Sequence, residues 1–260
     1  LEQGAEDNHV HLNLVSTGTF QNAQEEHTIV KRELDGEADG VIVEPYSSEA
    51  DVILPTESAK PVVLVGTGIE TDRLFTSVMT DHGKLGKSLA DAVIQGKAVK
   101  VGILSGNQSQ LGMRQRLKSV KDKLEEVGIE ISWILSEKEL DKKMRNVEYF
   151  AEQPVDTVIS LDNDDTEKAV DIILNDDRIS WKLYGEGRSE KLIYYLDKGT
   201  IQELAVPNEY YMGYQSIVLA AQNIRYYTDK TEQAEVEFYM VSKDNLYDEE
   251  TSRILFPAIR

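Results

Sequence analysis

A cluster of four polar residues, Asp162 to Asp165, directly follows an apolar run of the chain. Asp and Asn side chains accept hydrogen bonds from the free N–H groups at the start of a helix, so the cluster can cap one. The same oxygens can accept hydrogen bonds from the hydroxyl groups of a polyol. A calcium loop is excluded, because Glu167 and Ile173 stand where an EF-hand needs Gly and Glu. Capping and ligand binding both remain open for this cluster.

Two arginines and a glutamate widen the range of ligands to consider. Glu186 and Arg188 follow the next apolar run, and Arg114 lies earlier in the chain. A guanidinium group binds a carboxylate or a phosphate through two parallel hydrogen bonds, so Arg114 and Arg188 can together hold an anion. An anionic ligand is therefore as plausible as a neutral polyol.

Thr67 and His82 stand at the ends of two further apolar runs. Sheets of the α/β class bind ligands at the carboxyl ends of their strands, so both residues are candidate ligand contacts. The Gly-Thr-Gly sequence around Thr67 does not complete a dinucleotide fingerprint, because Thr71 stands where the third glycine is needed. A tight turn is the simpler interpretation of that sequence.

The chain carries no recognisable catalytic or metal-binding motif. It has no cysteine, which excludes zinc fingers, iron–sulfur ligation, Cys nucleophiles and disulfides. His9 and His11 alternate along one predicted strand without a third ligand nearby, so we expect both to face solvent. The Gly-Lys-Ser sequence at 86–88 lacks the earlier glycine of a phosphate loop, and no nucleophile elbow is present. These patterns disfavour an enzyme, and they predict no cofactor.

Tyrosines gather on one predicted helix that covers residues 208–227. They are Tyr210, Tyr211, Tyr214, Tyr226 and Tyr227. Aromatic side chains mostly fill cores, so we expect them to pack against the sheet. A surface on which a sugar ring stacks is the alternative.

Strand-like runs alternate with helical patterns over most of the chain. Candidate strands cover residues 10–15, 40–43, 61–65, 99–104, 129–134, 155–161, 181–184, 203–206 and 236–241. Candidate helices cover residues 84–94, 111–127, 136–151, 165–174 and 208–227. Several of the strands are continuous Val, Ile and Leu runs, which is typical of strands buried on both faces. The repeated strand–helix–strand order predicts an α/β fold with a parallel sheet covered by helices on both sides.

The start of the chain breaks this order. Residues 1–8 read as the end of a helix that leads into a predicted strand. A parallel sheet normally has a strand before such a helix, so we expect the first strand to lie upstream of Leu1.

Length and charge narrow the class of protein. The chain has 260 residues, which suits one large domain or two small ones. Its formal net charge is −19, which argues against binding nucleic acid or an anionic membrane surface, since both require Lys and Arg. The longest apolar runs are far shorter than the roughly 20 residues of a membrane span.

Six sequence patterns together resemble one known family. They are Ala38–Pro45, Lys60–Val65 with Val78–Asp81, Arg116–Val120, Leu161–Asp164, Leu196–Ile201 with Tyr211–Tyr214, and Val241–Asn245. In this order the chain resembles the type I periplasmic, or solute-binding, proteins of sugar ABC transporters, in the ribose and galactose branch.

The resemblance implies two doubly wound parallel-sheet lobes joined by a three-strand hinge, with the ligand in the cleft between the lobes. The first lobe would comprise residues 1–97 plus 208–232, and the second 98–207 plus 233–260. Arg114 and Asn163 match positions at which the family contacts its ligand. Gly66 to Gly68 replaces an expected Asp-Arg pair, and Pro207 replaces an expected hinge Gln, so the resemblance does not imply a standard pentose or hexose.

The resemblance implies a non-catalytic, extracytoplasmic solute-binding protein, lipid-anchored or tethered upstream. It would deliver a small polar, carbohydrate-like ligand to an ABC transporter permease or a membrane sensor, without nucleic acid as a partner. The alternative is the effector-binding domain of a transcription regulator of the lactose-repressor type, which shares this fold. The candidate ligand-binding residues are Arg114, Asn163, Asp162, Glu186, Arg188, Thr67, His82 and Asn208.

Overall fold

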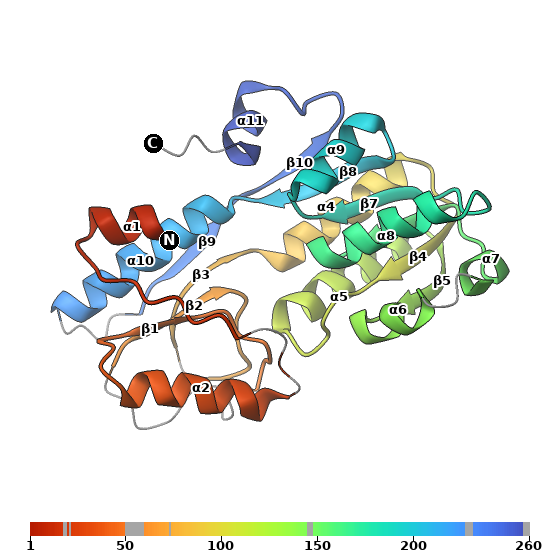
Figure 1. Ribbon diagram of the computed structural model, residues 1–260. Coiled ribbons are helices and arrows are strands. Elements are labelled where there is room, and N and C mark those ends of the chain that lie inside the picture. The colour runs from red at the N-terminus through yellow and green to blue at the C-terminus, as the bar shows by residue number, and fades with distance from the viewer. Residues whose placement is uncertain are drawn as a thin grey trace. The chain divides into compact units, whose positions relative to one another are not determined.

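The computed structural model describes residues 1–17, 20, 22–49, 60–72, 74–144, 148–226 and 231–256. The chain forms two compact units (Figure 1). The first unit comprises residues 1–81, 109–112 and 208–237, and the second comprises 82–108, 113–207 and 238–260. Neither unit is one continuous segment, because the chain passes from one to the other repeatedly.

The first unit contains a four-stranded parallel sheet in the order β1-β2-β3-β9. Its strands are β1 (Val41–Val43), β2 (Val62–Gly66), β3 (Thr76–Thr80) and β9 (Gln233–Val236). Val63 and Val78 are completely buried, as expected for neighbouring strands in the middle of a covered parallel sheet.

Three described helices belong to the first unit (Figure 1). They are α1 (Glu2–Asp7), α2 (Ala23–Asp35) and α10 (Glu209–Tyr226). Leu219 and Ala220 of α10 pack against the buried valines of the sheet. α10 also contacts α1, where a Cβ on Gly4 would lie 3.2 Å from the Cβ of Ile217. A glycine therefore allows the two helices to approach closely.

The second unit contains a six-stranded sheet in the order β10-β8-β7-β6-β4-β5. Its strands are β4 (Lys100–Leu104), β5 (Glu130–Leu135), β6 (Thr157–Ser160), β7 (Lys182–Glu186), β8 (Ile201–Pro207) and β10 (Phe238–Ser242). All neighbours are parallel except β10, which runs antiparallel to β8 at the edge of the sheet.

Helices cover both faces of the second sheet. They are α4 (His82–Gln95), α5 (Leu111–Glu126), α6 (Glu137–Lys143), α7 (Glu148–Glu152), α8 (Asn163–Asn175), α9 (Glu190–Lys198) and α11 (Glu249–Leu255). Val158 of β6 packs in one core cluster with α8 and α9, and the next residue, Ile159, packs in another with α4 and α5. Because successive strand residues point to opposite faces, this confirms the doubly wound arrangement.

The prediction of a strand over residues 10–15 is wrong. Residues 10–17 form neither helix nor strand and pair with no strand of the described chain. Alternating polar and apolar residues are not enough for a strand, because a strand needs a hydrogen-bonded neighbour. The expected pattern also missed β3, α9 and α11, and the candidate strand at 236–241 is divided between β9 and β10.

The compact units differ from the expected lobes in more than one place: residues 82–97 group with the second unit, and residues 109–112 and 233–237 with the first. In the structure α4 groups with the second unit, since Leu85, Leu89 and Val93 pack against Val101 of β4. Packing, and not position along the chain, thus assigns this helix. The two functional lobes and their hinge stay a prediction.

Candidate functional site

The guanidinium group of Arg116 lies at the carboxyl ends of the strands in the second unit. Arg116 belongs to α5 and is buried. Its Nη1 donates to the carbonyl oxygen of Leu161 at 2.5 Å, directly after β6, and lies 3.3 Å from Oε2 of Glu186 at the end of β7. Its Nε donates to Nδ1 of His82 at 3.0 Å. One side chain therefore joins α4, α5 and the ends of two strands.

This arrangement gives the residues around Arg116 defined hydrogen-bond and ion-pair roles. A nitrogen that accepts a hydrogen bond carries no proton, so Nδ1 of His82 is unprotonated. His82 is the first residue of α4. The buried carboxylate of Glu186 has the guanidinium as its counter-charge. Thus Arg116, which is not among the predicted ligand contacts, contacts two residues that are, His82 and Glu186.

Asp162 caps α8. Its Oδ1 accepts a hydrogen bond from the backbone N–H of Asp165 at 2.8 Å. The main chain at Gly106, with φ at +64°, passes so close to this carboxylate that a Cβ there would collide with it. Burial raises the pKa of Asp162, and the charge of Asp164 adds to this, while the bond from Asp165 and the charge of Arg116 oppose it. The capping interpretation of the polar cluster is confirmed for Asp162.

Asn163 connects the start of α8 to the loop before α9. Its Oδ1 accepts hydrogen bonds from the backbone N–H groups of Arg188 at 3.2 Å and Ser189 at 3.3 Å. The side chain of Arg188 turns toward α11, where Nη1 donates to the carbonyl oxygen of Ile254 at 3.3 Å. Asn163 and Arg188 are thus neighbours at the strand-end edge of the second unit.

Arg114 lies one half-turn before Arg116 on α5 and is half-buried. Its Nη1 donates to the carbonyl oxygen of Gln108 at 3.3 Å. This bond fixes Arg114 against the loop that follows β4.

The remaining two predicted contacts lie in the first unit. Thr67 is buried directly after β2, and its Oγ1 accepts a hydrogen bond from the backbone N–H of Gly112 at 2.9 Å. Asn208 caps α10, since its Oδ1 accepts from the backbone N–H of Tyr211 at 3.1 Å. Both side chains make contacts that shape the first unit, and their role toward a ligand stays a prediction.

Glu26 is a further organising residue of the first unit. It is buried on α2, and its carboxylate accepts hydrogen bonds from the backbone N–H groups of Tyr46 at 2.8 Å and Ser47 at 3.3 Å, in the loop that follows β1. Burial raises its pKa, and the two hydrogen bonds oppose that rise. The sequence did carry a signal, because Glu26 shares a helical face with the buried Val30 and Leu34.

The tyrosines of α10 do not all pack as expected. Tyr210 and Tyr211 are 47% and 46% exposed, and Tyr226 is exposed as well. The hydroxyl group of Tyr214 donates to Oδ2 of Asp7 in α1 at 3.2 Å. The expectation of packing against the sheet is wrong for the exposed three, because α10 buries Leu219 and Ala220 there instead. Tyr227 lies outside the described residues.

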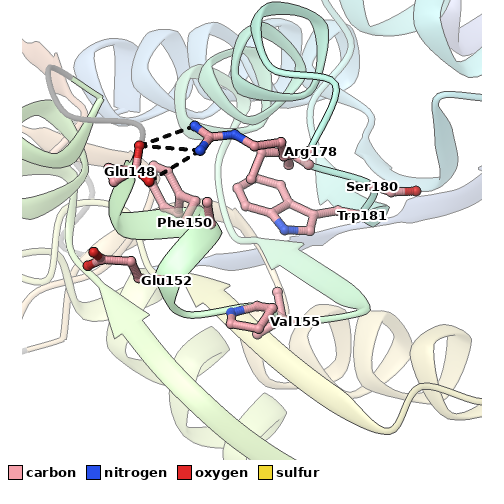
Figure 2. Close-up of a pocket in the computed structure, with 10 residues that line it drawn as sticks. Glu148, Phe150, Glu152, Val155, Arg178, Ser180 and Trp181 are labelled. Atoms are coloured by element: carbon pink, nitrogen blue, oxygen red, sulfur yellow. Dashed lines mark hydrogen bonds and ion pairs between the residues drawn. The ribbon is translucent and has the colours of Figure 1, made fainter.

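A hollow of about 340 Å³ lies elsewhere on the second unit (Figure 2). Phe150 and Trp181 line it, and the guanidinium of Arg178 faces the carboxylate of Glu148, with Nη1 and Oε1 3.2 Å apart. Trp181 immediately precedes β7, so the hollow lies at the amino ends of the strands. It contains none of the predicted ligand-binding residues, and we do not assign the site to it.

The described residues provide no metal centre and no membrane-spanning helix. Among them, no group of three or more His, Asp or Glu side chains is arranged to hold a metal ion. None of the helices in the described ranges is both long and apolar enough to cross a membrane. His9 and His11 are exposed, as expected.

Comparison with protein families gives one match of nearly full length. A family model described as a periplasmic binding protein domain matches residues 1–227. A search of curated proteins gives no match.

Solved structures with the same fold include three solute-binding proteins. A carbohydrate transporter solute-binding protein from Agrobacterium radiobacter, in complex with D-arabinose, has a TM-score of 0.85 at 16% identity, over 98% of this chain and 91% of that one. GanP, a glucose-galactose binding protein from Geobacillus stearothermophilus, has a TM-score of 0.82 at 22% identity, over 95% of this chain and 91% of that one. A Caulobacter myo-inositol binding protein, bound to myo-inositol, has a TM-score of 0.83 at 18% identity, over 97% of this chain and 89% of that one.

Proposed function

Because the chain belongs to the periplasmic binding protein family, we propose that it is an extracytoplasmic solute-binding protein. It captures a small polar ligand, a sugar or a sugar-like molecule, and presents it to an ABC transporter permease or to a membrane sensor. It binds this ligand without changing it chemically. A lipid anchor or another upstream tether holds it at the outer face of the membrane.

One observation carries this proposal beyond family membership. Polar side chains from α4, α5, β7 and the start of α8 gather at the carboxyl ends of the strands in the second unit, fixed around Arg116. This is the edge at which open α/β sheets bind ligands. Side chains that are already held in place lose little conformational entropy when a ligand binds, which favours affinity.

The proposed ligand contacts divide into two kinds. Arg114 and Asn163 carry donors and acceptors that suit hydroxyl groups, and the backbone N–H of Arg188 holds Asn163 in position. His82 and Glu186 contact Arg116 beside them, and Asp162 caps the helix that Asn163 begins. Thr67 and Asn208 of the first unit are ligand contacts predicted from the sequence alone. The three solved structures named above are described as binding arabinose, glucose and galactose, or myo-inositol, which are neutral molecules rich in hydroxyl groups. We therefore place polyols first among candidate ligands, and sugar phosphates second because of the two arginines. None of the comparisons favours a repressor.

A thermal-shift screen tests the proposal. The panel contains D-arabinose, D-galactose, D-glucose, myo-inositol, a sugar phosphate, an amino acid and a nucleoside. A ligand at about 100 times its Kd stabilises the folded protein by roughly 2.7 kcal/mol, which moves Tm by several degrees. A hit among the polyols or sugar phosphates supports a carbohydrate binder. A hit only with the amino acid or the nucleoside overturns the ligand class, and no shift with any compound contradicts the proposal.

Variants of α5 then locate the site. Arg114→Ala is expected to lower the affinity for the identified ligand at least tenfold while leaving Tm without ligand close to that of the wild type. Lys118→Ala is the matched control, because Lys118 lies on the same helix and is exposed. Equal affinities of the Arg114 variant and the wild type would remove Arg114 from the site.

A further inference from the structure

Asp165 is a buried carboxyl group with one unpartnered oxygen. The residue is in the first turn of α8 and is 0% exposed. Its Oδ1 lies 3.3 Å from Nζ of Lys168, while Oδ2 is buried and has no hydrogen-bond partner. A buried ionised carboxylate needs hydrogen bonds or counter-charge on both oxygens. Oδ2 of Asp165 lacks such a partner.

The surroundings of Asp165 contain more negative than positive charge. The groups that act on Asp165, on the neighbouring Asp162 or on Lys168 come from the preceding loop, α5, α6 and α8. They are Asp162, Arg116, Glu137, Asp141, Asp164 and Lys168. The two cations already have other partners. Arg116 pairs with Glu186, and Nζ of Lys168 lies closer to Oδ1 of Asp141, at 2.8 Å, than to Asp165.

Asp165 and the half-buried Asp162 also act on each other. Asp162 accepts the backbone N–H of Asp165, so their carboxyl groups stand at the same turn. Two neighbouring carboxylates in a poorly solvated place do not both ionise easily, and the pair then shares one proton. Burial raises the pKa of Asp165 to about 7, and the charge of Asp162 adds to this against the opposing Lys168.

We propose that Asp165 keeps a proton in the folded protein up to neutral pH and makes the corner between β6 and α8 responsive to pH. Loss of this proton places a second negative charge beside Asp162 and weakens the first turn of α8. The corner carries Asp162 and Asn163 at the strand-end edge of the second unit. The proposal concerns the protein without ligand and does not depend on the proposed function.

The direction of the effect follows from proton linkage. The folded protein binds the proton more tightly than the unfolded chain does, since unfolded Asp has its ordinary pKa of about 3.9. The stabilisation from this proton is full below that value and is lost as the pH rises through about 7. Within this window the folding equilibrium constant falls by up to about tenfold per pH unit.

Tryptophan fluorescence gives a reporter for the unit concerned. The chain has two tryptophans, Trp133 and Trp181, and both belong to the second unit. Urea unfolding of the full chain is followed by this signal at several values from about pH 5 to about pH 8.5. The variant is Asp165→Asn, and the matched control is Asp164→Asn, because Asp164 is exposed in the same turn.

The expected result is a stability difference that depends on pH. Asp165→Asn gains stability relative to the wild type as the pH rises from about 5 to about 7, and the difference levels off above that. Asp164→Asn, which removes only an exposed neighbouring charge, shows a much smaller pH-dependent difference from the wild type. A difference between Asp165→Asn and the wild type that stays constant over the whole range overturns the proposal.

A second measurement on the wild type covers the case in which Asp165→Asn does not fold. The chain is labelled with 13C at the carboxyl carbons of aspartate, and their shifts are followed by NMR as the pH changes. One carboxyl group that titrates near neutral pH supports the proposal. Titration of every aspartate in the ordinary acidic range overturns it.

Discussion

Arg116 and Glu186 form an ion pair in which Nη1 and Oε2 are 3.3 Å apart and the side chains are only 6% and 9% exposed. The pair connects α5 to the end of β7, although the two residues are far apart in the sequence. Because His82 and the carbonyl oxygen of Leu161 bind the same guanidinium, the pair is the centre of the strand-end edge of the second unit.

Removing the guanidinium is expected to destabilise the second unit strongly. Arg116→Met leaves Glu186 buried without its counter-charge and Leu161 without its donor, and losing one partner of a buried pair costs about 3 kcal/mol or more. Urea unfolding followed by tryptophan fluorescence measures the loss. Arg114→Met is the control on the same helix, and we expect a smaller loss from it. A loss below about 1 kcal/mol for Arg116→Met would contradict the structural role assigned to the pair.

Asp156 organises the opposite end of the same sheet. Its carboxylate accepts the backbone N–H groups of Val99 at 3.2 Å and Lys100 at 2.5 Å, and the hydroxyl of Thr157 at 2.9 Å. Burial by itself raises the pKa of Asp156, but these hydrogen bonds outweigh it and the pKa is lowered.

The depressed pKa of Asp156 predicts a pH dependence of the opposite sign to that of Asp165. Its contribution is present above the ordinary pKa of Asp and is lost as the pH falls through the lower value in the folded protein. Asp156→Asn is expected to cost about 2 kcal/mol at neutral pH and progressively less in acid. Unfolding free energies of the wild type and the variant at several pH values measure this. An equal cost in acid and at neutral pH would show that the charge of Asp156 is not what stabilises the sheet end.

Glu26 has the corresponding role in the first unit. Glu26→Ala deprives the backbone N–H groups of Tyr46 and Ser47 of their acceptor and is expected to cost about 2 kcal/mol. Glu26→Gln keeps one acceptor oxygen and should cost less.

The pH dependence of the Glu26 variants follows from its raised pKa. The stabilisation that the proton on Glu26 gives is present below the ordinary pKa of Glu and is lost as the pH rises through the higher folded value. The deficit of Glu26→Gln relative to the wild type should therefore shrink as the pH rises. Thermal unfolding of both proteins, followed by circular dichroism at several pH values, measures this deficit. A deficit that grows as the pH rises would contradict the prediction.

Gly106 is expected to tolerate no side chain. Its φ of +64° is unfavourable for other residues, and a Cβ there would strike the carboxylate of Asp162. Gly106→Ala should destabilise the second unit by about 2 kcal/mol, as a misplaced Cβ at positive φ does. Gly128→Ala is the control, because Gly128 has φ of +74° but open space around its Cβ position. Equal losses in both variants would mean that backbone strain alone, and not the contact with Asp162, sets the cost.

The class of fold and several local features follow from the amino-acid pattern. Alternation of apolar runs with helical periodicity gives the doubly wound sheets, because burial of both strand faces demands continuous apolar residues. Ser136 and Glu139 have the spacing of a capping box, and the structure contains one. Asp162 follows a strand and precedes a helix, so its capping role could also be foreseen. These features depend on residues a few positions apart.

Which partners the polar residues have depends on tertiary packing. Nothing in the spacing of His82, Arg116 and Glu186 indicates that the guanidinium of Arg116 contacts the other two side chains. Strand order and helix packing bring the three residues together. The same applies to α4, which its core contacts assign to the second unit. The same is true of residues 10–15. Their side chains alternate as in a strand, but no strand of the described chain pairs with this segment. Local patterns specify what a residue can do, but its neighbours in space specify what it does.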